Sequence, residues 1–231
     1  MPTYQHLFFD LDHTLWDFER NATETLLEMY QEFDIGEKGN VGEEEYLRVF
    51  REVNKILWAS YNEGKIDKQY IREYRFDMMF DRLGIDREEM SDNLGEIYLY
   101  RCPTKGHLLP HAQDALDYLA SNYRLHILTN GFEDVQGIKL ERSGIKHYFE
   151  TIVTSECTGH KKPSPEIFHH ALDRATATLT DSLMVGDNLD TDIAGAMGIG
   201  LDSVFYNPRK AFHQKKPKYE IECLSKLKEL L

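Results

Sequence analysis

Five short apolar segments, rich in β-branched and aromatic residues, constrain the fold of this chain more than any other feature. They read HLFFD, RLHILTN, FETIVTS, SLMVGD and DSVFYN, and they lie near residues 8, 127, 152, 185 and 204. Continuous apolar runs of this length suit strands that are buried on both faces, as in a parallel sheet. Helical segments alternate with them, so the sequence predicts an α/β fold with a Rossmann-like parallel sheet and right-handed crossovers.

Two of the intervening segments have clear helical features. In SPEIFHHALDRA, Ser164 stands where a helix N-cap is expected and Pro165 follows in the first turn. In PHAQDALDYLASN, the apolar residues recur on one stripe of a helix. These residues are Ala112, Ala115, Leu116 and Leu119.

The stretch from residue 17 to residue 100 interrupts the alternation, because it contains no convincing strand. Four segments in it have helical spacing, and glycine and acidic residues permit turns between them. The segments are NATETLLEMYQEF, EEEYLRVFREVNKILWASYN, DKQYIREYRFDMMFDRLG and REEMSDNLGEIYLYR. We therefore expect a Rossmann-like core made of residues 1–16 and 101–231, with an α-helical cap domain at residues 17–100.

The composition of the chain restricts the partners that it can be expected to bind and its expected location in the cell. The net charge of -13 argues against a nucleic-acid polymer, whose phosphates the chain would repel. One small phosphorylated ligand stays compatible, because a local lysine or a metal ion can reverse the sign inside a site. No apolar run approaches the ~18 residues of a membrane span, and MPTYQHLFFD lacks the regions of a signal peptide. Three scattered cysteines, Cys102, Cys157 and Cys223, are expected to be reduced and buried, so we expect a cytoplasmic protein without a membrane partner.

Polar residues follow several of the predicted strands. In an open parallel sheet, ligands bind beyond the carboxyl ends of the strands, so these residues are candidates for a site on one edge of the sheet. A lone pair of acids or a lone Thr-Asn-Gly would be read as a helix cap or a turn. The candidates are Asp10, Asp12, Thr14, Thr129, Asn130, Gly131, Lys161, Lys162, Asp187, Asp190 and Asp192.

Taken together, four sets of these residues resemble the four sequence motifs of the haloacid dehalogenase superfamily of phosphohydrolases. Each group follows the element that the superfamily pattern requires, and all four come in the expected order. The resemblance covers residues 5–16 and 101–208, and the helical insert occupies the family's cap position. The motif residues are Asp10, Asp12 and Thr14; Thr129; Lys162 before Pro163; and Gly186, Asp187 and Asp192.

The resemblance implies a reaction that proceeds through a covalent intermediate. Asp10 would attack phosphorus and form an aspartyl-phosphate, which divides a very slow hydrolysis into two easier steps. Asp12 would protonate the leaving oxygen and later deprotonate the attacking water. Thr14 would help to hold the loop that carries both acids.

The phosphate and a metal ion would share the site. By resemblance, Thr129 and the backbone amides of Asn130 and Gly131 would bind non-bridging phosphate oxygens, and Lys162 would neutralise developing charge.

Mg²⁺ is the implied cofactor, because it prefers a few carboxylate or carbonyl oxygens together with water and substrate phosphate. The family pattern supplies the Asp10 side chain, the Asp12 backbone carbonyl and Asp187 as metal ligands. Asp192 would orient a metal-bound water or Lys162, although Asp190 competes for that role.

Finer similarity points to a substrate class. The segments NKILWASYNEGKI and TNGFEDVQGIKLERSGIKHYF look like those of bacterial house-cleaning pyrimidine 5′-nucleotidases of this superfamily. The resemblance implies a small phosphorylated metabolite as partner, namely a pyrimidine nucleoside or deoxynucleoside 5′-monophosphate. The chain would act as a monomer or a homodimer.

Other functions remain open from the residues alone. Another small-metabolite phosphatase, such as a phosphoglycolate phosphatase, or a sugar-phosphate mutase of the β-phosphoglucomutase type would keep every motif. A 2-haloacid dehalogenase would share the fold and the nucleophile, but it needs neither Asp12 nor the metal-binding acids. A phosphoacceptor signalling module would use an Asp, a Thr and a Lys on a similar sheet, but such modules are much shorter and have no cap. A catalytically silent binding protein would not need all the acids.

Overall fold

The computed structural model describes residues 4–91 and 93–231, and it divides into two compact units. One unit ends at Phe18 and resumes at Gly106, and the other is Glu19–Lys105. The sequence placed the division after Trp16 and Tyr100. Phe18 stays with the first unit because its ring packs edge-on against Trp16, with the ring centroids 6.2 Å apart.

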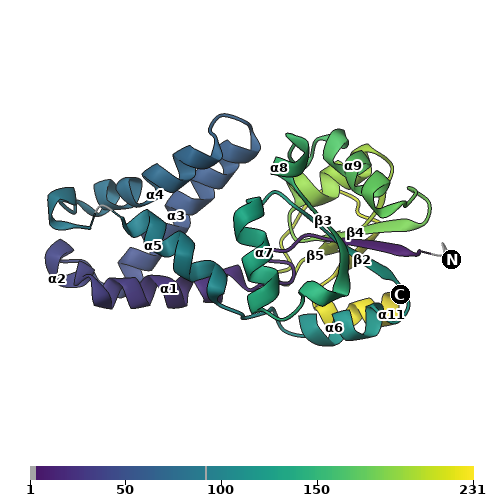
Figure 1. Cartoon of the computed structure of the whole chain (residues 1–231), viewed down its shortest axis with the longest axis horizontal. Coiled ribbons are helices and arrows are strands. Elements are labelled where there is room, and N and C mark those ends of the chain that lie inside the picture. Colours follow the sequence, from purple (N-terminus) through teal and green to yellow (C-terminus); the bar gives the residue numbers. More distant parts are fainter. Residues whose placement is uncertain (1–3, 92) are drawn as a thin grey trace. The chain divides into compact units, whose positions relative to one another are not determined.

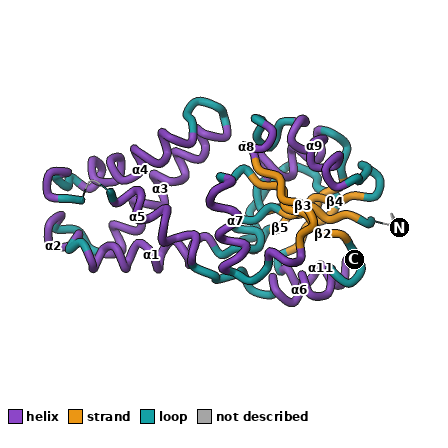
Figure 2. The backbone as a smooth tube through the Cα atoms, in the orientation of Figure 1, coloured by secondary structure: helices purple, strands orange, loops and turns teal. Residues whose placement is uncertain are grey.

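A six-stranded sheet forms the centre of the first unit, with the order β3-β2-β1-β4-β5-β6. Every neighbouring pair is parallel, which confirms the predicted sheet type. All five predicted strands are present (Figures 1 and 2). The strands are β1 (His6–Phe9), β2 (Arg124–Thr129), β3 (Phe149–Thr154), β4 (Ser182–Gly186), β5 (Asp202–Tyr206) and β6 (Tyr219–Ile221).

The β6 strand is the element of the sheet that sequence reasoning did not predict. It is three residues long, lies at one edge of the sheet and buries Ile221. A strand this short shows too little alternation to be separated from the loop before it. That loop contains the basic run RKAFHQKKPK, which is largely exposed.

Helices cover both faces of the sheet. In Figure 1, α8 and α9 lie on one face, and α6 and α11 lie on the other. The predicted apolar stripe of α6 is buried at all four positions. Ser164 lies at the N-cap position of α9 and Pro165 begins the helix as expected, but the Ser164 hydroxyl bonds Glu166 and caps no backbone amide. The helices of this unit are α6 (Ala112–Leu119), α7 (Glu133–Arg142), α8 (Ser155–Thr158), α9 (Pro165–Ala175), α10 (Ala194–Gly198) and α11 (Leu227–Leu230).

The apolar runs of the strands explain why the sheet is covered on both sides. Phe8, Leu128 and Met184 from the three central strands are buried in one cluster, where they join apolar residues of α9 such as Ile167 and Phe168. Burial of this kind contributes roughly 25 cal/mol for each Å² of apolar surface removed from water. The central strands therefore form a rigid platform for the residues at their carboxyl ends.

Two histidines lie among these buried strands. His6 Nδ1 lies 3.1 Å from His126 Nε2, and His126 Nδ1 lies 2.9 Å from the Thr151 hydroxyl. Both rings are buried. Burial, together with the neighbouring His6, lowers the pKa of His126 to about 4, so its ring is neutral at physiological pH.

The second unit is helical, as the sequence predicts. Asp67 caps α4 through a 2.8 Å hydrogen bond from the Tyr70 amide, and Gly84 ends the helix with a positive φ. A short helix, α2, lies in the predicted break DIGEKGNVG, and the last predicted helix divides into a 3₁₀ turn, Arg87–Glu89, and α5. The α-helices are α1 (Phe18–Glu32), α2 (Ile35–Gly39), α3 (Glu43–Asn62), α4 (Lys68–Leu83) and α5 (Leu94–Arg101).

The cysteines differ in part from expectation. Cys102 is buried as predicted, but Cys157 is exposed and Cys223 is half-buried. Cys157 lies in α8, a helix of a single turn that directly follows β3. Along residues 4–91 and 93–231, no helix combines the length and the apolar character needed to cross a membrane.

Candidate active site

Asp10 and Asp12 leave the sheet where its strand order changes direction. The β1 strand lies between β2 and β4, so the chain that follows β1 emerges at the crevice where open α/β sheets bind ligands. The Asp10 amide still donates to Val185 O at 2.9 Å, but the chain then turns. His13 adopts a left-handed conformation with φ 63°, which turns the loop back after Asp12.

Lys162 connects the loop after β3 to the end of β1. Its side chain is 2% exposed, and its ammonium group bonds Asp10 Oδ1, Asp192 Oδ1 and Leu128 O, each at 2.7 Å. A buried lysine needs partners of this kind, because an unpaired charge is very costly away from water. The structure therefore brings Lys162 directly to the predicted nucleophile.

Asn130 fixes the backbone of Lys162 from both sides. Its Oδ1 accepts from the Lys162 amide at 2.7 Å, and its Nδ2 donates to the Lys162 carbonyl at 2.9 Å. The sequence assigned Asn130 a role through its backbone amide only. Its side chain adds a second role, which is to hold the loop that presents the lysine.

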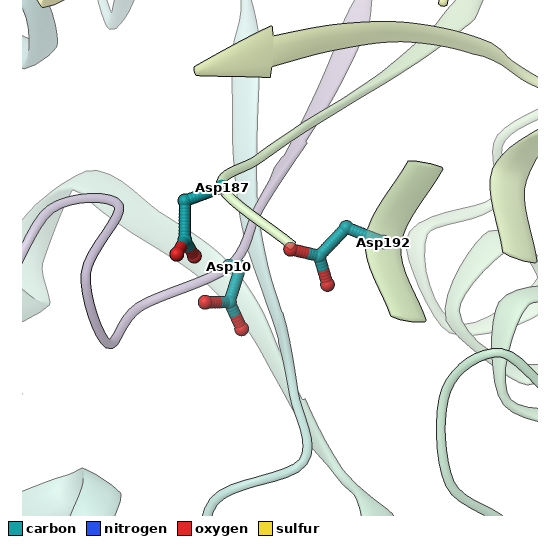
Figure 3. Close-up of side chains that lie close together, drawn as sticks. All are labelled: Asp10, Asp187 and Asp192. Atoms are coloured by element: carbon teal, nitrogen blue, oxygen red, sulfur yellow. The ribbon is translucent and has the colours of Figure 1, made fainter. Parts of the chain in front are cut away.

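Asp187 lies next to Asp10 and is held by Thr14. The Thr14 hydroxyl donates to Asp187 Oδ1 at 3.2 Å and accepts from the Asp187 amide at 3.1 Å. Figure 3 shows how the carboxylates of Asp10, Asp187 and Asp192 face one another. One oxygen from each lies within 4.8 Å of the others. These residues come from the ends of β1 and β4, which are neighbours in the sheet.

The structure separates Asp192 from its competitor. Asp192 is 1% exposed, contacts Lys162 and accepts from the Asn188 amide at 3.1 Å. The Asp190 side chain is 89% exposed and pairs with Lys215 at the surface. Gly186 is required for this packing, because a Cβ at that position would lie 2.3 Å from Asp192 Oδ2.

The charges in this cluster favour a cation. Lys162 brings one positive charge to three carboxylates. Burial raises the pKa of Asp10 to about 7, although the neighbouring Lys162 opposes the shift. Burial, followed by the charges of Asp10 and Asp192, also raises the pKa of Asp187 well above its ordinary value. Clustered carboxylate oxygens are hard ligands, so the residues present fit a divalent ion such as Mg²⁺.

Asp12 has a different environment, formed by two residues that sequence reasoning missed. Lys139 Nζ lies 2.6 Å from Asp12 Oδ1, and Gln136 Nε2 donates to Asp12 Oδ2 at 2.9 Å. Burial of Asp12 opposes ionisation, but Lys139 and these hydrogen bonds outweigh it and lower the pKa of Asp12. Both residues lie on the buried face of α7 together with Leu140. The i, i+3, i+4 spacing of the three was the available signal.

Thr129 ends β2 and completes the site. Its Oγ1 accepts from the Gly131 amide at 3.0 Å and from Gln136 Nε2 at 3.2 Å. These contacts occupy the acceptor positions of the hydroxyl and leave its own proton to be donated. The Gly131 amide, which the sequence assigned to phosphate, thus bonds Thr129 in the structure. A Cβ at position 131 would lie 1.5 Å from Gln136 Nε2, so glycine is needed there.

Known proteins resemble the chain over almost its whole length. The sequence model of the haloacid dehalogenase-like hydrolases matches residues 4–200. Pyrimidine 5′-nucleotidase YjjG of Escherichia coli is 30% identical over 97% of this chain and 96% of that protein. Pyrimidine 5′-nucleotidase PynA of Streptococcus pneumoniae is 32% identical over 96% of each chain.

A solved structure agrees in fold. The HAD-hydrolase YfnB of Bacillus subtilis, bound to magnesium, superposes with a TM-score of 0.87 at 28% identity, and the match covers 99% of this chain and 98% of that one.

Proposed function

The chain belongs to the haloacid dehalogenase-like hydrolases, and on that premise we propose that it is a Mg²⁺-dependent phosphomonoesterase with Asp10 as nucleophile. The observation that carries the proposal is the buried cluster in which Lys162 bonds both Asp10 and Asp192 while Asp187 lies beside them. A structural ion pair would need one carboxylate for one lysine. The additional acids are those of a site that receives a cation and an anionic substrate.

Asp10 would attack the phosphorus atom of the ester, and the bond from phosphorus to the leaving oxygen would break. The leaving oxygen takes a proton from the Asp12 carboxyl group and departs as an alcohol. In the second step, water attacks the phosphorus of the aspartyl-phosphate while the Asp12 carboxylate removes its proton. Inorganic phosphate leaves, and Asp10 and Asp12 return to their starting forms.

The remaining residues would bind the phosphoryl group and hold the acids in place. The Thr129 hydroxyl and the backbone amide of Asn130 would donate to non-bridging oxygens, and Lys162 would balance their charge. The Gly131 amide, which bonds Thr129 Oγ1, would hold that hydroxyl in position.

The bound Mg²⁺ would neutralise charge between the carboxylates and the phosphate. Asp10, Asp187 and the backbone carbonyl of Asp12 would be its ligands, while Asp192 would orient Lys162 and Thr14 would hold Asp187.

We propose pyrimidine nucleoside and deoxynucleoside 5′-monophosphates as the substrate class. The support is similarity to two pyrimidine 5′-nucleotidases at 30% and 32% identity over nearly the full chain. The residues described above would bind the phosphate group, which sugar phosphates also carry. The reaction type and the choice of base therefore rest on different support and need separate tests.

A substrate panel with and without metal tests both levels. The panel contains thymidine, deoxyuridine and adenosine 5′-monophosphates, p-nitrophenyl phosphate, glucose 6-phosphate, phosphoglycolate and 2-chloropropionate. We expect release of phosphate in Mg²⁺, fastest from the two pyrimidine nucleotides, and none in EDTA. Activity that survives EDTA would refute the metal-dependent mechanism. Cleavage of sugar phosphates without cleavage of pyrimidine nucleotides would refute the substrate class alone.

A further inference from the structure

The α7 helix buries two polar side chains where a helix packed on a core usually buries apolar ones. Gln136 is 1% exposed and Lys139 is 6% exposed. Lysine is almost never fully buried unless it is paired. Both side chains end at the same carboxylate, that of Asp12.

We propose that Gln136 and Lys139 are positioning residues, which hold the Asp12 carboxyl group where it can exchange a proton with the leaving oxygen and then with water. The inference rests on the proposed phosphomonoesterase function, in which Asp12 performs both proton transfers. Neither residue touches the reacting atoms in this scheme. Each acts through Asp12.

The two contacts fix the carboxyl group completely. Lys139 bonds Oδ1 at 2.6 Å and Gln136 bonds Oδ2 at 2.9 Å, so each oxygen has its own donor. Rotation of the group would break at least one of these bonds. The centroid of the Trp16 ring lies 4.4 Å from Lys139 Nζ, so the indole holds the ammonium group through a cation–π contact. Because Trp16 is fully buried in the loop that carries Asp12, it ties Lys139 to that loop.

Gln136 also links Asp12 to the phosphate-binding end of β2. The same Nε2 that bonds Asp12 donates to Thr129 Oγ1 at 3.2 Å. Reversing the amide would place Oε1 against the Asp12 carboxylate, so the charge of Asp12 dictates the orientation. One amide thus sets the position of the proton-transferring group relative to Thr129.

This orientation has a stability penalty. Among the residues that the structure describes, Gln136 Oε1 is a buried oxygen without a hydrogen-bond partner. A buried oxygen left without a donor lowers the stability of the fold. A leucine at this position would avoid that penalty, and the Asp12 side chain is 24% exposed and could be hydrated in part. The contacts of Gln136 are therefore better explained by geometry at Asp12 than by stability of the fold.

The test compares two esters that differ in their need for a proton. An alkyl phosphate releases a strongly basic alkoxide, whereas p-nitrophenyl phosphate releases a stabilised phenolate that needs little protonation. The ratio kcat/KM covers the steps up to transfer of the phosphoryl group to Asp10. For Lys139→Met and for Gln136→Met, we expect kcat/KM to fall about 10- to 100-fold on the alkyl phosphate that the panel identifies as fastest. On p-nitrophenyl phosphate it should fall less than about threefold.

A second comparison shows whether the two residues act through Asp12. In an Asp12→Asn background, Lys139→Met should lower kcat/KM on the alkyl ester by less than about twofold, because the group that it positions is already absent. Lys139→Arg should recover part of the loss. Lys146→Met serves as the matched control, since Lys146 lies at the surface beyond α7 with its side chain 48% exposed.

Each outcome decides the proposal. Equal losses on both esters, or an undiminished effect of Lys139→Met in the Asp12→Asn protein, would show a general effect on folding or phosphate binding and overturn it. Unchanged kinetics in both variants would overturn it as well, while an active parent enzyme leaves the proposed function intact. A parent protein that hydrolyses neither ester would overturn the proposed function and this inference together.

Discussion

Replacing Asp187 with asparagine should stabilise the metal-free protein while removing its response to Mg²⁺. Asp187 lies with Asp10 and Asp192 in a cluster whose ligand oxygens are within 4.8 Å of one another. Asparagine has the same shape and keeps an oxygen that can accept from Thr14, as Asp187 Oδ1 does. The substitution therefore removes one negative charge and leaves the packing nearly unchanged.

The size of the effect follows from the charges. At 4.8 Å and an effective dielectric constant of 20, two like charges repel by about 3.5 kcal/mol. Asp187 faces two carboxylates and the ammonium group of Lys162, which together amount to about one net repulsion. The raised pKa of Asp187 means that proton uptake relieves part of it. We expect the variant to gain about 2 kcal/mol, or about 4–8 °C in melting temperature for a chain of this size.

Mg²⁺ should reverse the order of stability of the parent protein and the Asp187→Asn variant. A ligand that binds only the folded state at 100 times its dissociation constant stabilises by about 2.7 kcal/mol. The parent protein should gain stability of this order in Mg²⁺, whereas Asp187→Asn should gain little because it lacks one ligand and one charge. An advantage in EDTA combined with a loss of metal response would be a trade of stability for function.

Thermal unfolding at pH 7.5, first in EDTA and then across a Mg²⁺ titration, measures both effects. Asp190→Asn is the matched control, because Asp190 lies three positions away and is exposed. It should change neither the melting temperature in EDTA nor the shift caused by Mg²⁺. If Asp187→Asn were less stable than the parent in EDTA, or responded to Mg²⁺ as the parent does, the electrostatic reasoning would be refuted.

Three further predictions concern the proposed nucleophile, the buried lysine and the buried His126. Asp10→Asn should abolish turnover of p-nitrophenyl phosphate with an unchanged circular dichroism spectrum, and substantial residual turnover would exclude Asp10 as the nucleophile. Lys162→Met should lower the free energy of unfolding in urea by about 3 kcal/mol at neutral pH, because it leaves buried carboxylates without their cation. Lys161→Met, which changes the half-buried neighbouring residue, should lower the free energy of unfolding far less. The pKa of His126 is lowered to about 4 in the folded protein, whereas the ordinary pKa of histidine is about 6.5. The neutral ring therefore contributes its full stabilisation above pH 6.5, and the free energy of unfolding should be lower by about 2 kcal/mol at pH 5. His126→Gln should flatten that decline, and an unchanged slope would contradict it.

The strands could be predicted from the sequence because their signal is local. HLFFD and SLMVGD are continuous apolar runs with polar residues directly after them, and the backbone fixes where those residues emerge. For the same reason, the sequence alone predicts Asp10, Thr129 and Asp187 on one edge of the sheet. The β6 strand carries no such run, since Tyr219–Ile221 depends on pairing with β5 to be extended.

The difference between Asp190 and Asp192 depends on the local backbone structure after β4. Both acids follow β4, and both lie in the turn Leu189–Ile193, which is a π-helical turn. A wider turn of this kind changes which side chains face inward, so the ordinary helical period does not apply. Asp192 faces Lys162 and Asp190 faces Lys215, a difference that spacing alone does not contain.

Lys139 and Gln136 could not be predicted as partners of Asp12, for a third reason. They lie more than a hundred positions from Asp12 in the sequence. Their spacing marks them as one face of a helix, and an apolar face would be the ordinary expectation there. Which acid they meet depends on the packing of α7 against the loop after β1, and that is a tertiary property.

Asp10 and Asp12 are two positions apart, yet their surroundings shift their pKa values in opposite directions. Burial raises that of Asp10, and Lys139 with Gln136 overcomes burial to lower that of Asp12. In the proposed reaction, the bound metal ion and phosphate would oppose both pKa shifts. A cation beside Asp10 favours its ionised, nucleophilic form, and a phosphate dianion near Asp12 favours the protonated form that donates to the leaving oxygen. The protein without ligands therefore has the partners that each acid requires. The substrate and the metal ion would supply the charges that bring each acid into the protonation state that its step needs.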